Sequence, residues 1–296
     1  MADAQPRIGR WRDATALLAD PPALRARAAE DGYLLLRGLL PPNVVLEVRG
    51  GLLALCQEAG WVTPEGRWTG AGPFIEGQPE FMAVYDRIQR LQAFHRLART
   101  PRLLALYEAL FARPVLAHPR NIARVMFPRN NAHATPAHQD ALHIRGTAQT
   151  WTAWLPLGDC PADLGGIALM PGSQREALLP THPAAGAGGR AVAAAALPYG
   201  WVGGDLHSGD VLTFHSHTVH CALPNRTRGR MRLSVDYRYQ PADEPVAPDS
   251  LQPHFGRLTW EEIYAGWREG AEDRHYWRLL PLRLEPGAAP SATPMA

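Results

Sequence analysis

The chain has 296 residues, with 30 basic and 28 acidic side chains and a formal net charge of +2. This balance gives no electrostatic reason to expect a nucleic-acid or membrane partner. Every basic residue is an arginine, so the sequence excludes Schiff-base chemistry, a pyridoxal-phosphate site and a lysine-bearing phosphate loop.

Cysteine usage and hydropathy predict a soluble, cytoplasmic protein. Cys56, Cys160 and Cys221 lie far apart and lack metal-ligand spacing, a pattern that argues against a disulfide framework. The N-terminal residues show no signal-peptide pattern. The most apolar stretch, Tyr33–Leu46, contains one arginine and two prolines and is too short to cross a membrane.

The first third of the chain is predicted to be mainly helical. A proline pair at 21–22 should restart the first helix, and proline is tolerated in the first turn of the second. Apolar residues between Phe81 and Leu97 recur at the three- and four-residue spacing of an amphipathic helix. The expected helices span about 14–29, 42–59, 81–97 and 103–111, and one short strand is expected at 33–36.

After Pro114 the pattern changes to short apolar runs separated by turn residues, which is typical of an antiparallel sandwich or barrel. The alanine- and glycine-rich stretch Thr181–Gly200 is predicted to be a surface loop over one mouth of this core. Closing helices are expected at 259–267 and 272–280. The expected strands are Ile122–Phe127, Thr147–Leu157, Ile167–Met170, Val211–Phe214 and Met231–Tyr239.

Together these elements predict one α+β domain with a mainly β core, spanning residues 1–286. Its helical N-terminal part should cover about 1–112, its β core about 114–241 and its C-terminal helices about 257–282. Residues 287–296 are expected to form a disordered tail. The oligomeric state cannot be inferred from the sequence.

The segment His138-Gln-Asp140 is the first candidate for chemistry. Residues two apart in an extended chain point to the same face, so an imidazole and a carboxylate would lie side by side. A histidine from a distant strand would complete a two-histidine, one-carboxylate face, which is diagnostic of mononuclear non-haem Fe(II) oxygenases. His215, His217 and His220 are the candidates for that third ligand.

Arg232 is a second candidate, because strand alternation places it on one face with Arg230 and Ser234. An arginine that points into a barrel is costly unless it pairs with an anion. A dicarboxylate cosubstrate would supply that anion, with the serine hydroxyl beside it. Arg230 adjoins Gly229 and is expected to face solvent, although the register leaves it open as the partner.

The sequence resembles the phytanoyl-CoA dioxygenase family of Fe(II)- and 2-oxoglutarate-dependent oxygenases over nearly its whole length. The resemblance rests on motifs spread along the chain. They are Asp31–Pro42, His138-Gln-Asp140, Trp154–Asp159, Gly165-Gly166, Pro171-Gly-Ser173, Gly209-Asp210, His220, Asn225 and Arg232. Two positions depart from the family: Gln174 follows Pro-Gly-Ser, and Cys221-Ala-Leu223 replaces a small polar segment.

The resemblance implies a double-stranded β-helix (jelly-roll) core with the N-terminal helices packed outside. It implies that His138, Asp140 and His220 bind Fe(II). It also implies that Arg232, helped by Ser234, binds the distal carboxylate of 2-oxoglutarate in a pocket that Thr152 and Trp154 line. O2 would be the second cosubstrate. Because Asp140 is a carboxylate, where related halogenases carry a small residue, hydroxylation of an unactivated C–H bond is expected.

The substrate is expected to be a small molecule, and an alanine-rich, lysine-free composition suggests bacterial secondary metabolism. His143 and Arg145 follow the metal segment and are predicted to contact the substrate, because loops after ligand strands line the mouth of such a core. Two alternatives remain open from the residues alone. One is a metal-dependent hydrolase on the same ligands, and the other is a non-catalytic, ligand-binding jelly roll.

Overall fold

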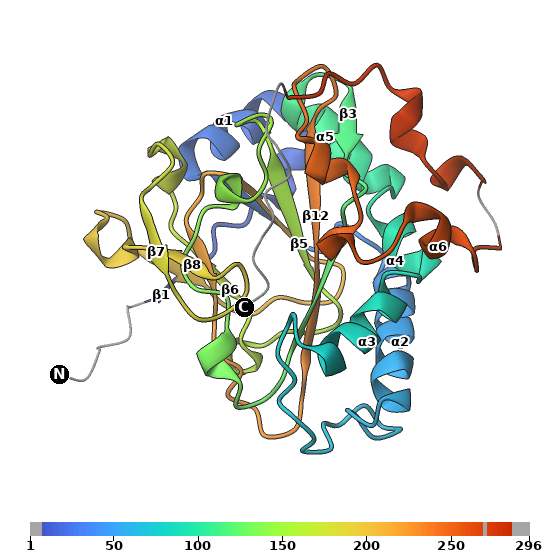
Figure 1. Cartoon of the computed structure of the whole chain (residues 1–296). Coiled ribbons are helices and arrows are strands. Elements are labelled where there is room, and N and C mark those ends of the chain that lie inside the picture. The colour runs from blue at the N-terminus through green and yellow to red at the C-terminus, as the bar shows by residue number, and fades with distance from the viewer. Residues whose placement is uncertain (1–7, 269–270, 286–296) are drawn as a thin grey trace.

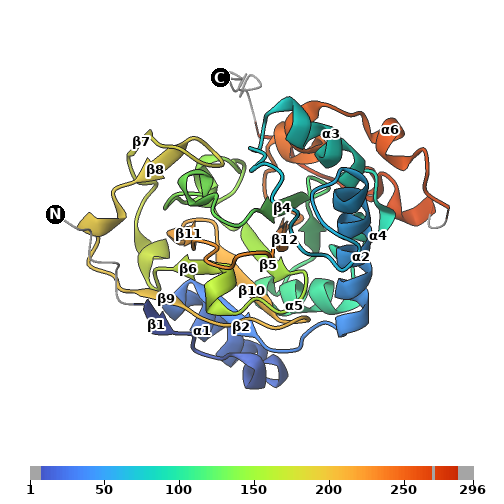
Figure 2. The same ribbon diagram turned by 90° about the horizontal axis from the view of Figure 1, so that it is seen from below.

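The computed structural model describes residues 8–268 and 271–285. A large antiparallel sheet has the strand order β2-β10-β5-β12-β3, with β4 also paired to β12. A smaller sheet has the order β1-β9-β6-β11, in which β1 and β9 are parallel. Figure 2 shows the smaller sheet on one side of the large one and helices α2 and α4 on the other. This arrangement confirms the predicted α+β jelly roll with outer helices.

The described elements run along the chain as follows (Figure 1). The helices are α1 Pro21–Asp31, α2 Pro42–Glu58, α3 Pro79–Ile88, α4 Gln92–Leu97, α5 Pro101–Phe111 and α6 Trp260–Tyr264. The strands are β1 Ile8–Arg10, β2 Tyr33–Leu36, β3 Val115–Ala117, β4 Ile122–Met126, β5 Trp151–Pro156, β6 Ile167–Leu169, β7 Thr181–Pro183, β8 Arg190–Val192, β9 Trp201–Gly203, β10 Val211–His215, β11 His220–Ala222 and β12 Arg232–Pro241.

The period-two alternation of β12 divides its ten buried residues between two environments. Odd-numbered residues such as Leu233 and Tyr237 join the core cluster formed with the outer helices. Even-numbered residues from Arg232 to Arg238 are polar and buried, and the three charged ones line a pocket together with residues of β6 and β11 in the smaller sheet. The neighbouring strand β5 alternates in the same way, with Trp154 in the cluster shared with the smaller sheet. The inner face of the large sheet is therefore where polar chemistry is concentrated.

Three expected elements differ from the structure. The single helix predicted over 81–97 is divided into α3 and α4, because the Gln89 carbonyl lies 2.8 Å from His95 Nε2 and bonds to that side chain. The stretch predicted as a loop over 181–200 contains the β7–β8 hairpin, whose turn uses Gly186 at a φ of +103°. The predicted helix over 272–280 contains only short 3-10 turns, Ala271–Asp273 and Tyr276–Leu279.

Smaller differences concern where elements begin. The segment predicted as helix from residue 14 starts with a 3-10 turn, Thr15–Ala19, before α1, and the strand expected from Thr147 begins at Trp151. The tail predicted at 287–296 lies outside the described residues, and the predicted domain boundaries stay a prediction. No helix within residues 8–268 and 271–285 is long and apolar enough to cross a membrane.

Candidate metal centre

Two segments far apart in sequence bring three metal-ligating side chains together. His138 and His220 form an isolated antiparallel bridge, with reciprocal backbone hydrogen bonds of 2.9 and 3.0 Å between their amides and carbonyls. Gln139 is extended, so Asp140 follows on the same side before a 3-10 turn begins. The ligating atoms of His138, Asp140 and His220 all lie within 4.8 Å of one another, and all three residues are buried.

Backbone carbonyls orient both imidazoles toward one point. Nδ1 of His138 lies 2.9 Å from the Pro136 carbonyl, and Nδ1 of His220 lies 2.9 Å from the Thr218 carbonyl. Each Nδ1–H therefore donates to a carbonyl, which leaves Nε2 with its lone pair free for a metal. The two Nε2 atoms lie 3.5 and 3.7 Å from Oδ1 of Asp140. This donor set fits Fe(II) in a two-histidine, one-carboxylate face.

The second oxygen of Asp140 is held by two other side chains. Thr152 donates its hydroxyl to Oδ2 at 2.5 Å, and Nη2 of Arg238 lies 3.4 Å from the same oxygen. Burial by itself would raise the pKa of Asp140, but the charge of Arg238 holds that pKa well below its usual range. Burial, with the neighbouring His138, lowers the pKa of His220 to about 3. The site is therefore an ionised carboxylate beside a neutral His220, the states that bind a divalent cation.

Arg232 lies in the same pocket, and its side chain is buried. Nη1 donates to Oγ of Ser234 at 3.0 Å, and the guanidinium carbon is 5.7 Å from the centre of the Trp154 ring. Among the described residues no carboxylate lies within ion-pair distance of Arg232, and its Nε has no hydrogen-bond partner. A buried guanidinium without a counter-ion needs an anion. The distal carboxylate of 2-oxoglutarate fits that need.

Arg230, the alternative anchor, does not face this pocket. It is exposed and precedes β12, and its Nη2 donates to the Asp159 carbonyl at 3.2 Å. Ser234 contacts Arg232 rather than the open space of the pocket. The strand geometry therefore favours Arg232 over Arg230 as the partner of an anion.

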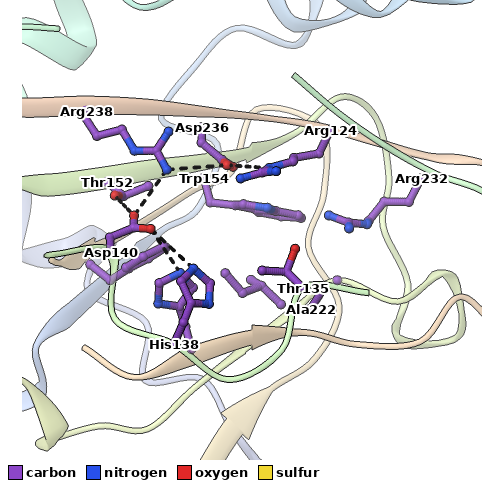
Figure 3. Close-up of a pocket in the computed structure, with 14 residues that line it drawn as sticks. Arg124, Thr135, His138, Asp140, Thr152, Trp154, Ala222, Arg232, Asp236 and Arg238 are labelled. Carbon is purple, nitrogen blue, oxygen red and sulfur yellow. Dashed lines mark hydrogen bonds and ion pairs between the residues drawn. The ribbon is translucent and has the colours of Figure 1, made fainter. Parts of the chain in front are cut away.

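The pocket has a volume of about 420 Å³ including its opening. Figure 3 shows His138 and Asp140 at one side of it and Arg232 at the other. Thr152 and Trp154 are among its lining residues, and the Thr152 hydroxyl donates to Asp140; their contact with 2-oxoglutarate stays a prediction. The full lining is Arg124, Thr135, His138, Asp140, Thr152, Trp154, Gly166, Ile167, Phe214, His220, Ala222, Arg232, Asp236 and Arg238.

Three charged residues of this lining were missed from the sequence: Arg124, Asp236 and Arg238. Asp236 and Arg238 have the same parity in β12 as Arg232 and Ser234, so strand alternation alone could have placed them on the inner face. Arg124 lies on β4, opposite Ser234 in the register. Its Nε donates to Asp236 at 3.0 Å, and its Nη1 contacts both carboxylate oxygens of Glu76, at 3.0 and 3.1 Å.

The other predicted histidines and Arg145 lie away from the pocket wall. His215 packs edge-on against Trp151, and His217 Nδ1 is 3.2 Å from the Glu176 carbonyl, so neither joins the metal-ligating group. The His143 ring centre is 6.2 Å from that of His138. Arg145 Nη2 lies 3.3 Å from Asp249 Oδ2. Neither His143 nor Arg145 lines the pocket, and their contact with substrate stays a prediction.

Comparison with known proteins agrees with this geometry. The family model for phytanoyl-CoA dioxygenase (PhyH) matches residues 28–233. The chain is 29% identical over 283 residues to a 1-deoxypentalenic acid 11-beta-hydroxylase of Streptomyces arenae, covering 89% of this chain and 92% of the relative. The corresponding hydroxylase of Streptomyces exfoliatus is 28% identical, covering 88% of this chain and 91% of the relative.

Solved structures of Fe- and 2-oxoglutarate-dependent enzymes share the fold of this chain. The epimerase SnoN from nogalamycin biosynthesis, in complex with Fe3+, alpha ketoglutarate and nogalamycin RO, has a TM-score of 0.56 and 25% identity, covering 78% of this chain and 87% of that one. The carbocyclase SnoK from the same biosynthesis has a TM-score of 0.54 and 20% identity, covering 89% and 93%, and supports the fold alone. The chain belongs to the phytanoyl-CoA dioxygenase family and is an Fe- and 2-oxoglutarate-dependent oxygenase.

Proposed function

We propose that this oxygenase hydroxylates an unactivated C–H bond of a small molecule. The balanced reaction converts the C–H bond, 2-oxoglutarate and O2 into the C–OH product, succinate and CO2. The observation that carries this proposal is the arrangement of two free Nε2 atoms and Asp140 Oδ1 at one side of a pocket, with Arg232, which has no carboxylate partner among the described residues, at the other. Asp140 supplies the carboxylate that a halide-binding site would lack.

Each residue has a distinct part in this scheme. His138, Asp140 and His220 would hold Fe(II), and when bound this metal with 2-oxoglutarate and O2 supplies the oxidant for the C–H bond. Arg232 would bind the distal carboxylate of the cosubstrate, and Ser234 would fix the direction of the guanidinium. Trp154 would pack beside that cosubstrate, because it lines the pocket and its ring centre is 5.7 Å from the guanidinium carbon of Arg232. Ile167, Phe214 and Ala222 give the pocket apolar walls that exclude water.

The substrate is proposed to be a natural-product scaffold of bacterial secondary metabolism. The curated relatives are named as hydroxylases, and SnoN was solved with nogalamycin RO. A second hollow shares Arg124, Thr135 and Arg232 with the lining of the pocket, and Phe74, Val125 and Met126 contribute apolar surface there. We propose that a scaffold larger than the cosubstrate would extend in this direction.

We also propose that the protein acts in the cytoplasm. All three cysteines are unpaired. Burial raises the pKa of the Cys56 and Cys221 thiols to about 12, which favours the neutral thiol over the reactive thiolate. Free thiols at all three cysteines support a reducing compartment. Fractionation of the producing cell, with a cytoplasmic and a secreted marker, tests this location.

The decisive experiment needs no substrate. Fe(II) and then 2-oxoglutarate are added to the apoprotein without oxygen, and the visible metal-to-ligand charge-transfer band is recorded. We expect the band in the wild-type protein and in Arg230→Ala. In Arg232→Ala we expect the band to require at least about tenfold more 2-oxoglutarate, because a charge-assisted contact is lost.

Two results would contradict the proposal. If iron binds but no charge-transfer band forms with 2-oxoglutarate, the proposed reaction is wrong. If Arg230→Ala changes the 2-oxoglutarate concentration that the band requires and Arg232→Ala does not, then Arg230 binds the distal carboxylate. A metal analysis of protein purified without added metal accompanies the experiment, because the hydrolase alternative expects zinc or manganese in place of iron.

A further inference from the structure

Two adjacent charged side chains in the pocket carry polar atoms that nothing in the described residues satisfies. Arg238 and Asp236 lie on the inner face of β12, and their side chains are 6% and 9% exposed. Nε and Nη1 of Arg238 have no hydrogen-bond partner, and neither has Oδ1 of Asp236. Both residues line the pocket that contains the metal-ligating group (Figure 3). Buried polar atoms left unpaired are costly, so their place in a pocket wall points to a ligand.

The other atoms of the same two groups are already engaged, which fixes their orientation. Arg238 Nη2 contacts Asp140 Oδ2 at 3.4 Å and lies 3.7 Å from Asp236 Oδ2. Asp236 Oδ2 also accepts from Arg124 Nε at 3.0 Å. The two residues that carry the unpaired donors and the unpaired acceptor are therefore neighbours, and Arg238 also contacts the carboxylate of Asp140.

The charges around Asp236 and Arg238 cancel once the metal and 2-oxoglutarate are bound. Arg124 is matched by Glu76, and Arg238 by Asp236. In the proposed complex the metal's two charges are matched by Asp140 and the chelating carboxylate of 2-oxoglutarate, and Arg232 by the distal carboxylate. Among the residues that line the pocket, no positive charge remains for a carboxylate or phosphate of the substrate, and no negative charge remains for an amine.

We propose that Asp236 and Arg238 form a substrate-binding subsite for an uncharged group that both accepts and donates a hydrogen bond, of which the hydroxyl is the smallest. The hydroxyl oxygen accepts from the free N–H groups of Arg238, and its proton is donated to Oδ1 of Asp236. The substrate class is therefore a neutral, already oxygenated scaffold, held by that oxygen beside the metal. This inference rests on the proposed function and specifies its substrate.

Three probes test the subsite without knowledge of the substrate: cyclohexanol, cyclohexanecarboxylate and cyclohexylammonium. They share the cyclohexane ring and differ only in the charge of the attached group. Each is titrated into enzyme loaded with Mn(II) and 2-oxoglutarate. Binding is followed through the paramagnetic relaxation of the ring protons, which reports only probes close to the metal. We expect the wild-type enzyme to bind cyclohexanol at least about tenfold more tightly than either ion, since each ion leaves a buried charge uncompensated.

Variants of the pair should change this preference in opposite directions. Asp236→Asn leaves Arg238 unmatched, so the ratio of carboxylate to alcohol affinity should rise at least about tenfold. Arg238→Gln leaves Asp236 unmatched and should favour the ammonium probe by a similar factor. Arg238→Lys keeps the charge but loses the free Nε, so it should weaken cyclohexanol without favouring the ammonium probe. Asp243→Asn is the control, because Asp243 is exposed and pairs with Arg113 at the surface.

The outcomes separate this inference from the proposed function. A wild-type enzyme that prefers either ion, or that binds none of the probes up to their solubility, overturns the subsite. Substitutions that leave the affinity ratios between the probes unchanged overturn it as well. If the Fe(II) enzyme gives no charge-transfer band with 2-oxoglutarate, the proposed function itself fails. A normal band with the wrong probe ranking removes only the subsite.

Discussion

Arg238 and Thr152 are register partners on the adjacent strands β12 and β5, and both side chains contact Oδ2 of Asp140. Oδ1 of the same carboxylate is the oxygen nearest Nε2 of His138 and His220. The large sheet therefore orients Asp140 as a ligand that offers one oxygen. This orientation depends on the pairing of β5 with β12, which places the Thr152 hydroxyl and the Arg238 guanidinium opposite each other in the register.

Thr152→Val should weaken metal binding while the fold is kept. The substitution preserves shape but removes the 2.5 Å hydrogen bond to Oδ2, so Asp140 becomes free to rotate. Partners that orient a metal ligand typically account for about 10–100-fold in affinity or activity. We expect the Fe(II) dissociation constant to rise by about tenfold, measured by anaerobic titration.

Thr213→Val provides the matched control for that change. Thr213 is also a buried strand threonine, but its hydroxyl lies 2.7 Å from the Tyr107 hydroxyl, on the helix-covered face of the large sheet. Its loss should lower stability and leave the Fe(II) dissociation constant unchanged. Equal weakening of Fe(II) binding in both variants would mean that general loosening of the sheet, and not the Asp140 contact, is responsible.

Ser234→Ala should weaken 2-oxoglutarate binding and leave the metal in place. The serine accepts from Arg232 Nη1 at 3.0 Å, and without it the guanidinium loses both a partner and a fixed direction. Because this bond is present with or without cosubstrate, only the loss of a fixed guanidinium direction weakens binding, and we expect an effect of up to about tenfold in affinity. The charge-transfer band, titrated with 2-oxoglutarate at saturating Fe(II), measures the effect. An unchanged titration curve would remove Ser234 from the cosubstrate site.

Asp140→Ala should abolish succinate formation, because the face loses its only carboxylate ligand. We expect a drop of at least about 100-fold, assayed as succinate released with 2-oxoglutarate and O2, with circular dichroism confirming the fold. His217→Ala is the comparison, since His217 lies outside the metal-ligating group, and it should retain Fe(II) binding. Activity in folded Asp140→Ala would overturn the ligand assignment.

The stability of the apoprotein should fall between pH 7 and pH 5. Burial lowers the pKa of His95 and of His118 to about 4, from about 6.5 in the unfolded chain. The unfolded state therefore binds more protons over this range, and the stabilisation present above pH 6.5 is lost as the pH falls toward 4. Each histidine should cost about 1–2 kcal/mol of unfolding free energy at pH 5.

Urea unfolding at a series of pH values measures this loss. In His118→Asn the pH dependence should shrink by one histidine's share, whatever the substitution does to stability at pH 7. His118 suits this test because its Nε2 lies 2.8 Å from Gln240 Oε1, an interaction that does not involve the metal ligands. Stability that is constant from pH 7 to pH 5 would contradict the buried neutral state of these histidines.

Local patterns in the sequence determined a large part of this protein. The antiparallel sandwich or barrel, the extended His138-Gln-Asp140 pair and the inward direction of Arg232 all follow from residue type and a period of two. The jelly-roll topology was implied by the family resemblance. The same parity also applies to Asp236 and Arg238. Parity alone does not distinguish a buried charged pair from a pair that faces solvent. The interruption between α3 and α4 was not predictable, because it depends on His95 bonding to a backbone carbonyl.

Only the tertiary structure decided which groups meet. His220 rather than His215 or His217 completes the metal face because the His138 segment pairs with it through its backbone, a contact across 82 residues. Strand β12 begins at Arg232, so Arg230 lies before the strand and does not share its inner face. Thr152 reaches Asp140, and Asp236 lies beside Arg238, through the register of β5, β12 and β4. Periodicity specifies the face on which a side chain lies, whereas strand pairing between distant segments specifies its neighbours.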